Sequence, residues 1–162
     1  EFAVGTLYNM FDGKRAMYRE LCQDRMEDYI GEVTEALKGI EDPREGIREI
    51  IRAKFRFFRE NQPFVRIFEH MTRNGDQQDQ PSMMTAHAGR AFEHYLKMEA
   101  RLFEEGMKRG VFVELNPTLA ATTLEGMTHA AIGYFIRTGK GKPDEATERQ
   151  IEDTLLSGIL AR

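Results

Sequence analysis

The chain has 162 residues, of which 41% are hydrophobic and 31% are charged, as expected for a globular protein with one substantial core. No apolar run approaches the roughly 18 residues of a membrane-spanning helix, so we expect no membrane association. Cys22 is the single cysteine, which excludes an internal disulfide and a cysteine-only metal site and fits a reducing cytoplasm. The net charge of −4 argues against broad, nonspecific nucleic-acid binding by the body of the protein, because such binding needs a basic surface.

The first fourteen residues carry the most specific pattern in the chain. It consists of Val4-Gly5-Thr6-Leu7-Tyr8, then Phe11 and Lys14, with Met17-Tyr18 following at helical spacing. Leu7 and Phe11 are four residues apart, so they share one helix face and suit burial. Thr6, Tyr8 and Asn9 place hydrogen-bonding groups near the start of the helix, where contacts to phosphates and base edges are made. The alternative is a short amphipathic helix with no role in DNA binding.

This pattern resembles the recognition helix and following turn of the TetR family of transcriptional regulators. The resemblance implies an all-α, TetR-like fold in which residues 1–13 are a remnant of the helix-turn-helix DNA-binding domain. Residues 14–162 would form an antiparallel helical ligand-binding and dimerisation domain, and the first two helices of the DNA-reading unit would be missing. The DNA-contacting residues that the resemblance implies are Val4, Gly5, Thr6, Tyr8, Asn9 and Lys14. The first three would lie nearest the bases, and the last three would mainly contact the backbone of the DNA.

Beyond Lys14, apolar residues at steps of three and four predict a long helix to about Ile40, closed by Gly39 and Pro43. Pro43 opens a second helix with an isoleucine- and phenylalanine-rich face. A second face of this helix carries a ridge of arginines: Arg44, Arg48, Arg52, Arg56 and Arg59. We interpret this ridge as a solvated face with intrahelical ion pairs, in preference to a phosphate or partner site.

The remaining chain predicts four further helices. Gln62-Pro63 ends the second helix, and a short third one covers Phe64 to Met71. Residues 73–81 contain no apolar side chain and predict an exposed loop. The later helices are expected from Ser82 to about Arg109, from Asn116-Pro117 to about Thr138, and from Asp144 to about Leu160. The β-prone segment 111–113 is too short to build a sheet.

The central helices are rich in aromatic and methionine side chains, an adaptable lining that suits an apolar or aromatic small molecule. Histidines on these helices could orient such a ligand. The ligand-binding candidates are Phe55, Phe58, Met84, His87, Tyr95, Met98 and His129. Ordinary core packing or surface exposure would also account for each of them.

The last two predicted helices carry features of a helix-pairing surface. One has small residues on a nearly common face, and the other has an apolar stripe. In the TetR family the last two long helices pair with their symmetry mates, and palindromic operators require a two-fold dimer. The implied homodimer interface comprises Gly126, Ala130, Gly133, Ile151, Leu155 and Ile159. Packing within the monomer is the alternative.

Enzymatic motifs are absent from the sequence: it contains no His-Glu-x-x-His, P-loop, GxSxG or dinucleotide fingerprint. Glu125 and His129 could share a metal, but two ligands do not make a site. We therefore expect no catalytic residue, metal or cofactor. The predicted function is a cytoplasmic, homodimeric transcriptional regulator, a repressor that a small molecule releases from operator DNA. The alternative is a helical small-molecule-binding or dimerisation module without a DNA role.

Overall fold

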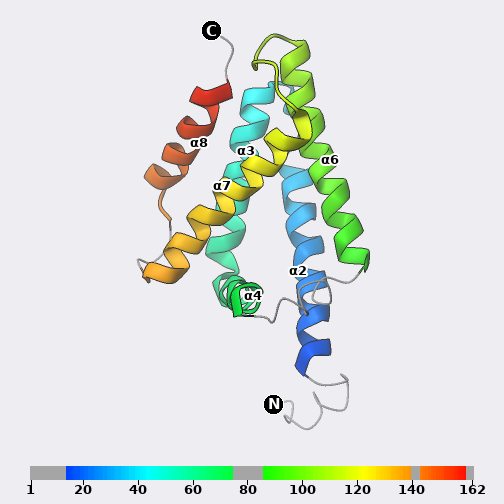
Figure 1. Ribbon diagram of the computed structural model, residues 1–162, viewed down its shortest axis with the longest axis vertical. Coiled ribbons are helices and arrows are strands. Elements are labelled where there is room, and N and C mark those ends of the chain that lie inside the picture. Colours follow the sequence, from blue (N-terminus) through cyan, green and yellow to red (C-terminus); the bar gives the residue numbers. More distant parts are fainter. Residues whose placement is uncertain (1–13, 75–85, 140–142, 160–162) are drawn as a thin grey trace.

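The computed structural model describes residues 14–74, 86–139 and 143–159, and in these ranges the protein is all-α with no strand (Figure 1). The helices are α2 (Lys14–Ala36), α3 (Pro43–Glu60), α4 (Gln62–Asn74), α6 (Ala86–Lys108), α7 (Pro117–Thr138) and α8 (Glu145–Ile159). The predicted all-α fold is thus confirmed. None of the helices in the described ranges is long and apolar enough to cross a membrane.

Short capping sequences explain where two of the helices begin. Asp42 Oδ1 accepts a hydrogen bond from the Arg44 N–H at 2.9 Å, and Pro43 is the first residue of α3. Asn116 Oδ1 likewise accepts from the Leu119 N–H at 3.1 Å, and Pro117 is the first residue of α7. A proline fits this first position because its missing N–H would have no partner inside the helix.

The first long helix is shorter than the sequence predicted. The periodic pattern extended to about Ile40, but α2 ends at Ala36. A turn replaces the last predicted residues: the Lys38 N–H donates to the Glu35 carbonyl at 3.1 Å, and the Ile40 N–H donates to the Leu37 carbonyl at 3.2 Å. Gly39 between them has φ +78°, a left-handed conformation that terminates helices and favours glycine.

Helix α3 is the centre of the fold, because it packs against α2, α4, α6, α7 and α8 (Figure 1). Its apolar face is almost completely buried: Ile47, Ile50, Ile51 and Phe55 are 0% exposed. Burying such a side chain stabilises a protein by about 1.5–3 kcal/mol. The spacing of these residues predicted an amphipathic helix with one buried face. In the structure, other helices cover α3 on several sides.

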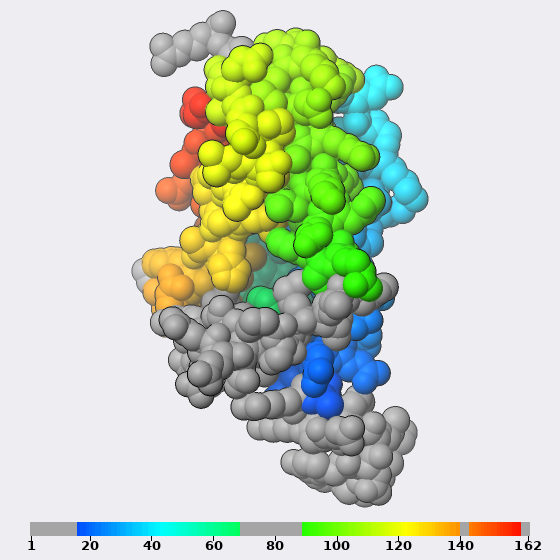
Figure 2. All heavy atoms as spheres, turned by 45° about the vertical axis from the view of Figure 1, so that its right-hand side comes forward, coloured from blue at the N-terminus to red at the C-terminus, as the bar shows by residue number. Residues whose placement is uncertain are grey.

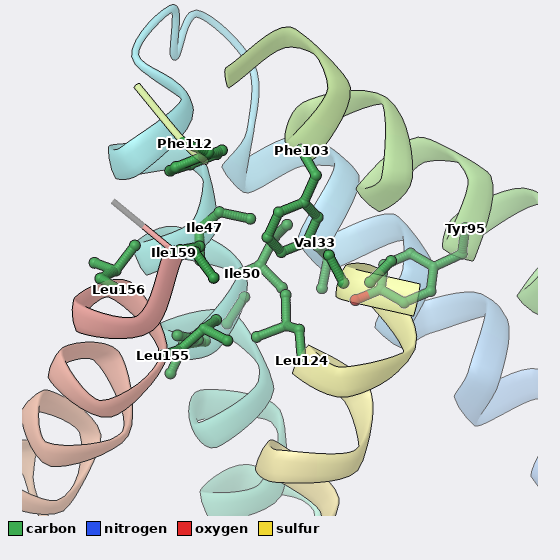
Figure 3. Close-up of a cluster of buried hydrophobic side chains, with 14 of the residues drawn as sticks. Val33, Ile47, Ile50, Tyr95, Phe103, Phe112, Leu124, Leu155, Leu156 and Ile159 are labelled. Carbon is green, nitrogen blue, oxygen red and sulfur yellow. The ribbon is translucent and has the colours of Figure 1, made fainter. Parts of the chain in front are cut away.

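Helix α8 packs on α3 through both apolar and charged side chains. Leu155, Leu156 and Ile159 join the same core cluster as Ile47 and Ile50 (Figure 3). The Val113 N–H also donates to the Ile159 carbonyl at 2.8 Å, so the end of α8 is tied to the segment before α7. The apolar stripe of α8 is therefore used inside the monomer.

The interpretation of the arginine ridge as a solvated face with intrahelical ion pairs is incomplete, because three of its members also pair with glutamates of α8. Arg52 Nε lies 3.1 Å from Glu152 Oε1, Arg48 Nε lies 3.7 Å from Glu152 Oε2, and Arg59 pairs with Glu148. Glu148 and Glu152 on α8 are buried. Intrahelical pairs, such as Arg48 with Glu45, are present as well. The ridge thus also holds α8 to α3, because α8 presents carboxylates to it.

Helices α6 and α7 lie side by side and form one face of the molecule (Figure 2). The turn between them folds back on α6, where Phe112 is 3% exposed and its ring centroid lies 5.8 Å from that of Phe103. Gly106 on α6 lies directly against the Phe112 ring, and a Cβ at this position would overlap it. The close approach requires a glycine at 106.

We predict that Gly106→Ala lowers the free energy of unfolding by about 1–3 kcal/mol, because the added methyl group displaces the buried Phe112 ring. Gly31→Ala is the matched control, since a Cβ at Gly31 meets nothing within 4 Å. Gly31 is within α2, so this control should raise stability by roughly 0.5–1 kcal/mol. Urea unfolding measures both effects, and equal stabilities of the Gly106→Ala variant and the parent would contradict the prediction.

Candidate ligand-binding cavity

A cavity of about 550 Å³ lies among α2, α3, α4, α6 and α7. This volume is in the range of sites that hold small molecules. Its apolar lining is mostly aromatic and consists of Met26, Phe57, Phe58, Phe64, Val65, Phe68, Phe92 and Ile132. Its other lining residues are Arg25, Tyr29, Lys54, Thr122, Glu125, Gly126, Thr128 and His129. The cavity therefore combines an aromatic body with a few polar groups.

The turn between α3 and α4 brings the aromatic side chains together. The Asn61 backbone N–H and its Nδ2 both donate to the Phe57 carbonyl, at 2.9 and 3.0 Å, and end α3 there. Helix α4 starts at Gln62, so Phe64 and Phe68, four residues apart, lie on one face of it. The ring centroids of Phe57 and Phe64 are 6.5 Å apart, in an edge-to-face arrangement. Two consecutive helices thus form one aromatic wall.

A buried charge cluster forms the polar end of the cavity where α3, α6 and α7 meet. Lys54 on α3 is 4% exposed and Glu99 on α6 is 0% exposed, with 3.3 Å between Lys54 Nζ and Glu99 Oε1. Lys54 Nζ also donates to Glu125 Oε1 on α7, and it lies 3.5 Å from Thr128 Oγ1. One ammonium group therefore faces two carboxyl groups that come from two other helices.

Two tyrosines connect this cluster to α2. The Tyr95 hydroxyl donates to Glu99 Oε1, and the hydroxyl oxygens of Tyr95 and Tyr29 are 2.9 Å apart. Tyr29 lies on α2 and lines the cavity, whereas Tyr95 is 1% exposed and lies behind it. A change in the cavity can therefore reach α2 through hydrogen bonds as well as through packing.

Glu99 is in an unusual electrostatic environment. Burial raises the pKa of its carboxyl group to about 8; the Lys54 ammonium opposes this increase, and the negative charge of Glu125 adds to it. Glu99 Oε2 is buried and has no hydrogen-bond partner among the described residues. Burial also raises the pKa of Tyr29 and Tyr95 well above the ordinary value, so both hydroxyls stay protonated. A carboxyl group with this pKa is mostly protonated at neutral pH.

Residues 41–159 match the family model described as tetracyclin repressor-like, C-terminal domain. This match covers most of the chain. The chain belongs to the TetR family. Comparison with curated proteins gives no match.

Solved structures of TetR-family and other regulators share the fold. The ketosteroid regulator KstR2 of Mycobacterium tuberculosis has a TM-score of 0.78 at 19% identity, over 99% of this chain and 80% of that one. FadR from Bacillus subtilis in complex with stearoyl-CoA has a TM-score of 0.78 at 19% identity, over 97% and 82% of the two chains. AibR in complex with isovaleryl coenzyme A and operator DNA has a TM-score of 0.67 at 20% identity, over 95% and 78%.

Of the ligand-binding candidates whose side chains the structure describes, only Phe58 and His129 line this cavity. Phe55 instead points into the core, because it lies on the fully buried face of α3. Tyr95 is behind the charge cluster, and Met98 packs against the core. Met84 and the side chain of His87 lie outside the described residues.

The polar end of the cavity was not predicted from the sequence. One feature of the sequence could have indicated it, namely a lysine inside an apolar stripe. Lys54 lies three residues from Ile51 and four from both Ile50 and Phe58. A charged residue on a buried face needs a partner, which indicates a polar site. The partners Glu99 and Glu125 could not be identified from spacing, because they lie on other helices.

The dimer candidates of this TetR-family chain fall into two groups. On α8, Leu155 and Ile159 are buried in the monomer core and Ile151 packs against it, because α8 places its apolar stripe on α3. Gly133 on α7 is also buried. Gly126 and Ala130 on α7 are exposed, and Gly126 also lines the cavity. The predicted pairing surface is thus not one continuous face of the two helices.

The DNA-contacting candidates Val4, Gly5, Thr6, Tyr8 and Asn9 lie outside the described residues, and Lys14 is the first residue of α2. Within the described ranges, no group of three or more His, Cys, Asp or Glu side chains is arranged to hold a metal ion.

We predict that the unfolding free energy falls as the pH rises from about 5 to 8. The pKa of Glu99 is raised in the folded protein to about 8, so in this range the folded chain keeps a proton that the unfolded chain has lost. The loss can reach about 1.4 kcal/mol per pH unit.

Glu99→Gln should remove this dependence, since glutamine does not titrate. The exposed Glu114→Gln is the control and should keep it. Urea unfolding at several pH values measures the slopes; equal slopes in Glu99→Gln and the parent protein would show that another group is responsible.

Proposed function

We propose that this protein is a transcriptional repressor that binds operator DNA and releases it when a small molecule with an apolar or aromatic body occupies the cavity. The observation that carries the proposal is that α2 lines this cavity with Arg25, Met26 and Tyr29. The same helix begins at Lys14, directly after the segment that resembles a recognition helix. Such a regulator would act in the cytoplasm, where its operator is.

Helix α2 is the proposed link between ligand and DNA. The ring of Tyr29 packs edge-on against Phe57, with centroids 5.3 Å apart, so this part of α2 rests on the aromatic wall. Lys14 is roughly 16 Å from Arg25 along the helix axis, at 1.5 Å per residue. A small tilt of α2 at the cavity would therefore move its other end by more. The ligand releases DNA only if it binds the tilted conformation more tightly than the DNA-bound one.

The structural neighbours support both parts of this proposal. AibR was solved with isovaleryl coenzyme A and operator DNA, and FadR from Bacillus subtilis with stearoyl-CoA. Their fold can therefore hold a ligand with an apolar part, and in AibR it does so in a protein that binds DNA. Membership of the TetR family supports the regulatory role of this chain.

We predict that the full-length protein shifts a DNA fragment from its own promoter region in a gel assay at low salt without ligand. Tyr8→Ala should weaken this binding, because a phosphate contact is lost, without lowering the melting temperature. Thr34→Ala, on the exposed surface of α2, is the control and should leave binding unchanged. A protein that shifts no such fragment would favour a ligand-binding module without a DNA role.

We also propose that the protein is a homodimer that pairs through the exposed face of α7. Leu119, Gly126, Ala130 and Tyr134 are spaced by seven, four and four residues, so they form one stripe along the helix. Leu119 is 64% exposed and Tyr134 is 42% exposed, so the stripe presents large apolar side chains on the surface of the monomer. The small residues between them would let a second helix approach closely. Of the six residues implied by the family resemblance, this surface keeps Gly126 and Ala130.

Ala130→Arg should convert the dimer to a monomer, because a long charged side chain in the centre of the stripe keeps two α7 helices apart. Thr34→Arg adds the same side chain to the exposed surface of α2 and should remain dimeric. Light scattering at micromolar concentration gives the mass of each variant. A monomeric parent protein, or a dimeric Ala130→Arg variant, would rule out this interface.

A further inference from the structure

We propose that the effector is an organic cation, with its positive group against Glu125 and its apolar body against the aromatic wall. This proposal rests on the proposed function, in that it takes the cavity to be the effector site. It adds the charge of the ligand, which the hydrogen bonds at the polar end of the cavity determine.

The hydrogen-bond donors at the polar end are already in use. The three N–H groups of Lys54 face Glu99, Glu125 and Thr128. The Tyr95 hydroxyl donates to Glu99, so the proton between the two tyrosines must come from Tyr29. The Thr128 hydroxyl lies 2.9 Å from the Leu124 carbonyl, to which it donates. Lys54, Tyr95, Tyr29 and Thr128 therefore offer an entering anionic group no donor that is not already paired.

Acceptors, in contrast, remain available there. Lys54 and Glu99 are the hydrogen-bond partners found for the Glu125 carboxyl group within the described residues, and a carboxylate has about four lone-pair sites, so further acceptor positions remain. The Glu125 side chain lines the cavity and keeps 21% of its surface exposed. The Tyr29 hydroxyl uses its proton in the hydrogen bond to Tyr95. From the cavity side its oxygen can therefore only accept a hydrogen bond. An acceptor-only site is complementary to an ammonium or guanidinium group.

The charged groups around the cavity also favour a cation over an anion. The positive charge of Lys54 is balanced by Glu125, and Glu99 adds a negative charge only when it loses its proton near pH 8, so the cluster has no unbalanced positive charge for an anion. Of the other charged or titratable lining residues, Arg25 is paired with Asp28 at 3.1 Å and is 40% exposed, and His129 lies one turn beyond Glu125 on α7. The aromatic wall adds attraction for a cation, because the faces of aromatic rings attract positively charged groups.

Glu99 gives this binding a measurable signature. A cation beside Glu125 offsets the negative charge that helps to raise the pKa of Glu99. The groups facing Glu99 are Lys54 from α3, Glu125 from α7, Tyr29 from α2 and Tyr95 from its own helix. Since the pKa of Glu99 is about 8 without ligand, binding below pH 8 should release a proton. Affinity for a permanent cation should therefore rise with pH up to about 8 and then level off.

The test is calorimetric titration of the full-length protein with ligands that share a decyl chain: decyltrimethylammonium, decanol, decanoate and decanoyl-CoA. We expect the ammonium compound to bind at least about tenfold more tightly than the others, because only it meets an opposite charge in a desolvated aromatic site. Repeating the titration in two buffers of different ionisation enthalpy measures proton release. Equal or tighter binding of any other ligand, or no binding of the ammonium compound, overturns the proposal.

Three variants assign the effect to the two carboxyl groups. Glu125→Gln should weaken binding of decyltrimethylammonium about tenfold, because the opposite charge is lost while Lys54 keeps Glu99 as its partner. Glu99→Gln should bind the cation with an affinity that no longer changes with pH. The exposed Glu114→Gln is the control and should behave as the parent protein. Circular dichroism checks that each variant folds, and unchanged affinity in a folded Glu125→Gln variant overturns the proposal.

The outcomes separate this inference from the proposed function. If decanoyl-CoA releases the protein from its promoter fragment and the ammonium compound does not, the protein is still a ligand-responsive repressor. Its effector is then not a cation. A protein that binds the ammonium compound with proton release but shifts no DNA keeps the cation site and loses the regulatory function.

Discussion

The ammonium group of Lys54 is buried where three helices meet, and its charge has to be balanced there. Removing an ammonium group from water costs several kcal/mol unless a carboxylate and further hydrogen bonds compensate. Glu99 from α6 and Glu125 from α7 provide this compensation, and Tyr95 connects Glu99 to Tyr29 on α2. The relative positions of four helices are therefore coupled to one cluster of polar atoms. Because the same cluster ends the cavity, whatever enters the cavity acts on the arrangement of the helices.

The apolar core around α3 provides the stabilisation that offsets the free-energy cost of burying this cluster. Ile47, Ile50 and Phe55 are fully buried against the surrounding helices, and α8 closes one side with Leu155 and Leu156 (Figure 3). Such packing offsets the cost of the buried charges and fixes α3 in place. Helix α2, in contrast, meets the cavity through Arg25, Met26 and Tyr29, so part of its support comes from the site that a ligand would fill. A rigid centre with one helix resting on a cavity is an arrangement suited to ligand control.

Much of the fold could be predicted because its signals are local. Asp42-Pro43 and Asn116-Pro117 carry their own capping groups, and the apolar spacing of α3 is visible over a few turns. The candidate site was predicted less well. Phe58 and His129 line the cavity, but Phe55 and Tyr95 face the core, and a helical period of 3.6 residues cannot tell which apolar face meets a cavity and which meets another helix.

Local sequence patterns predicted the resemblance to the TetR family, the order of the helices, and a small-residue face and an apolar stripe on the last two helices, because these features depend on neighbouring residues. The partners of these helices and side chains depend on the three-dimensional packing. The stripe of α8 packs on α3, its glutamates pair with the arginine ridge, and Lys54 finds Glu99 and Glu125 on separate helices. These contacts join residues that are far apart in the chain, and they form only when the packing of the whole core brings the helices together.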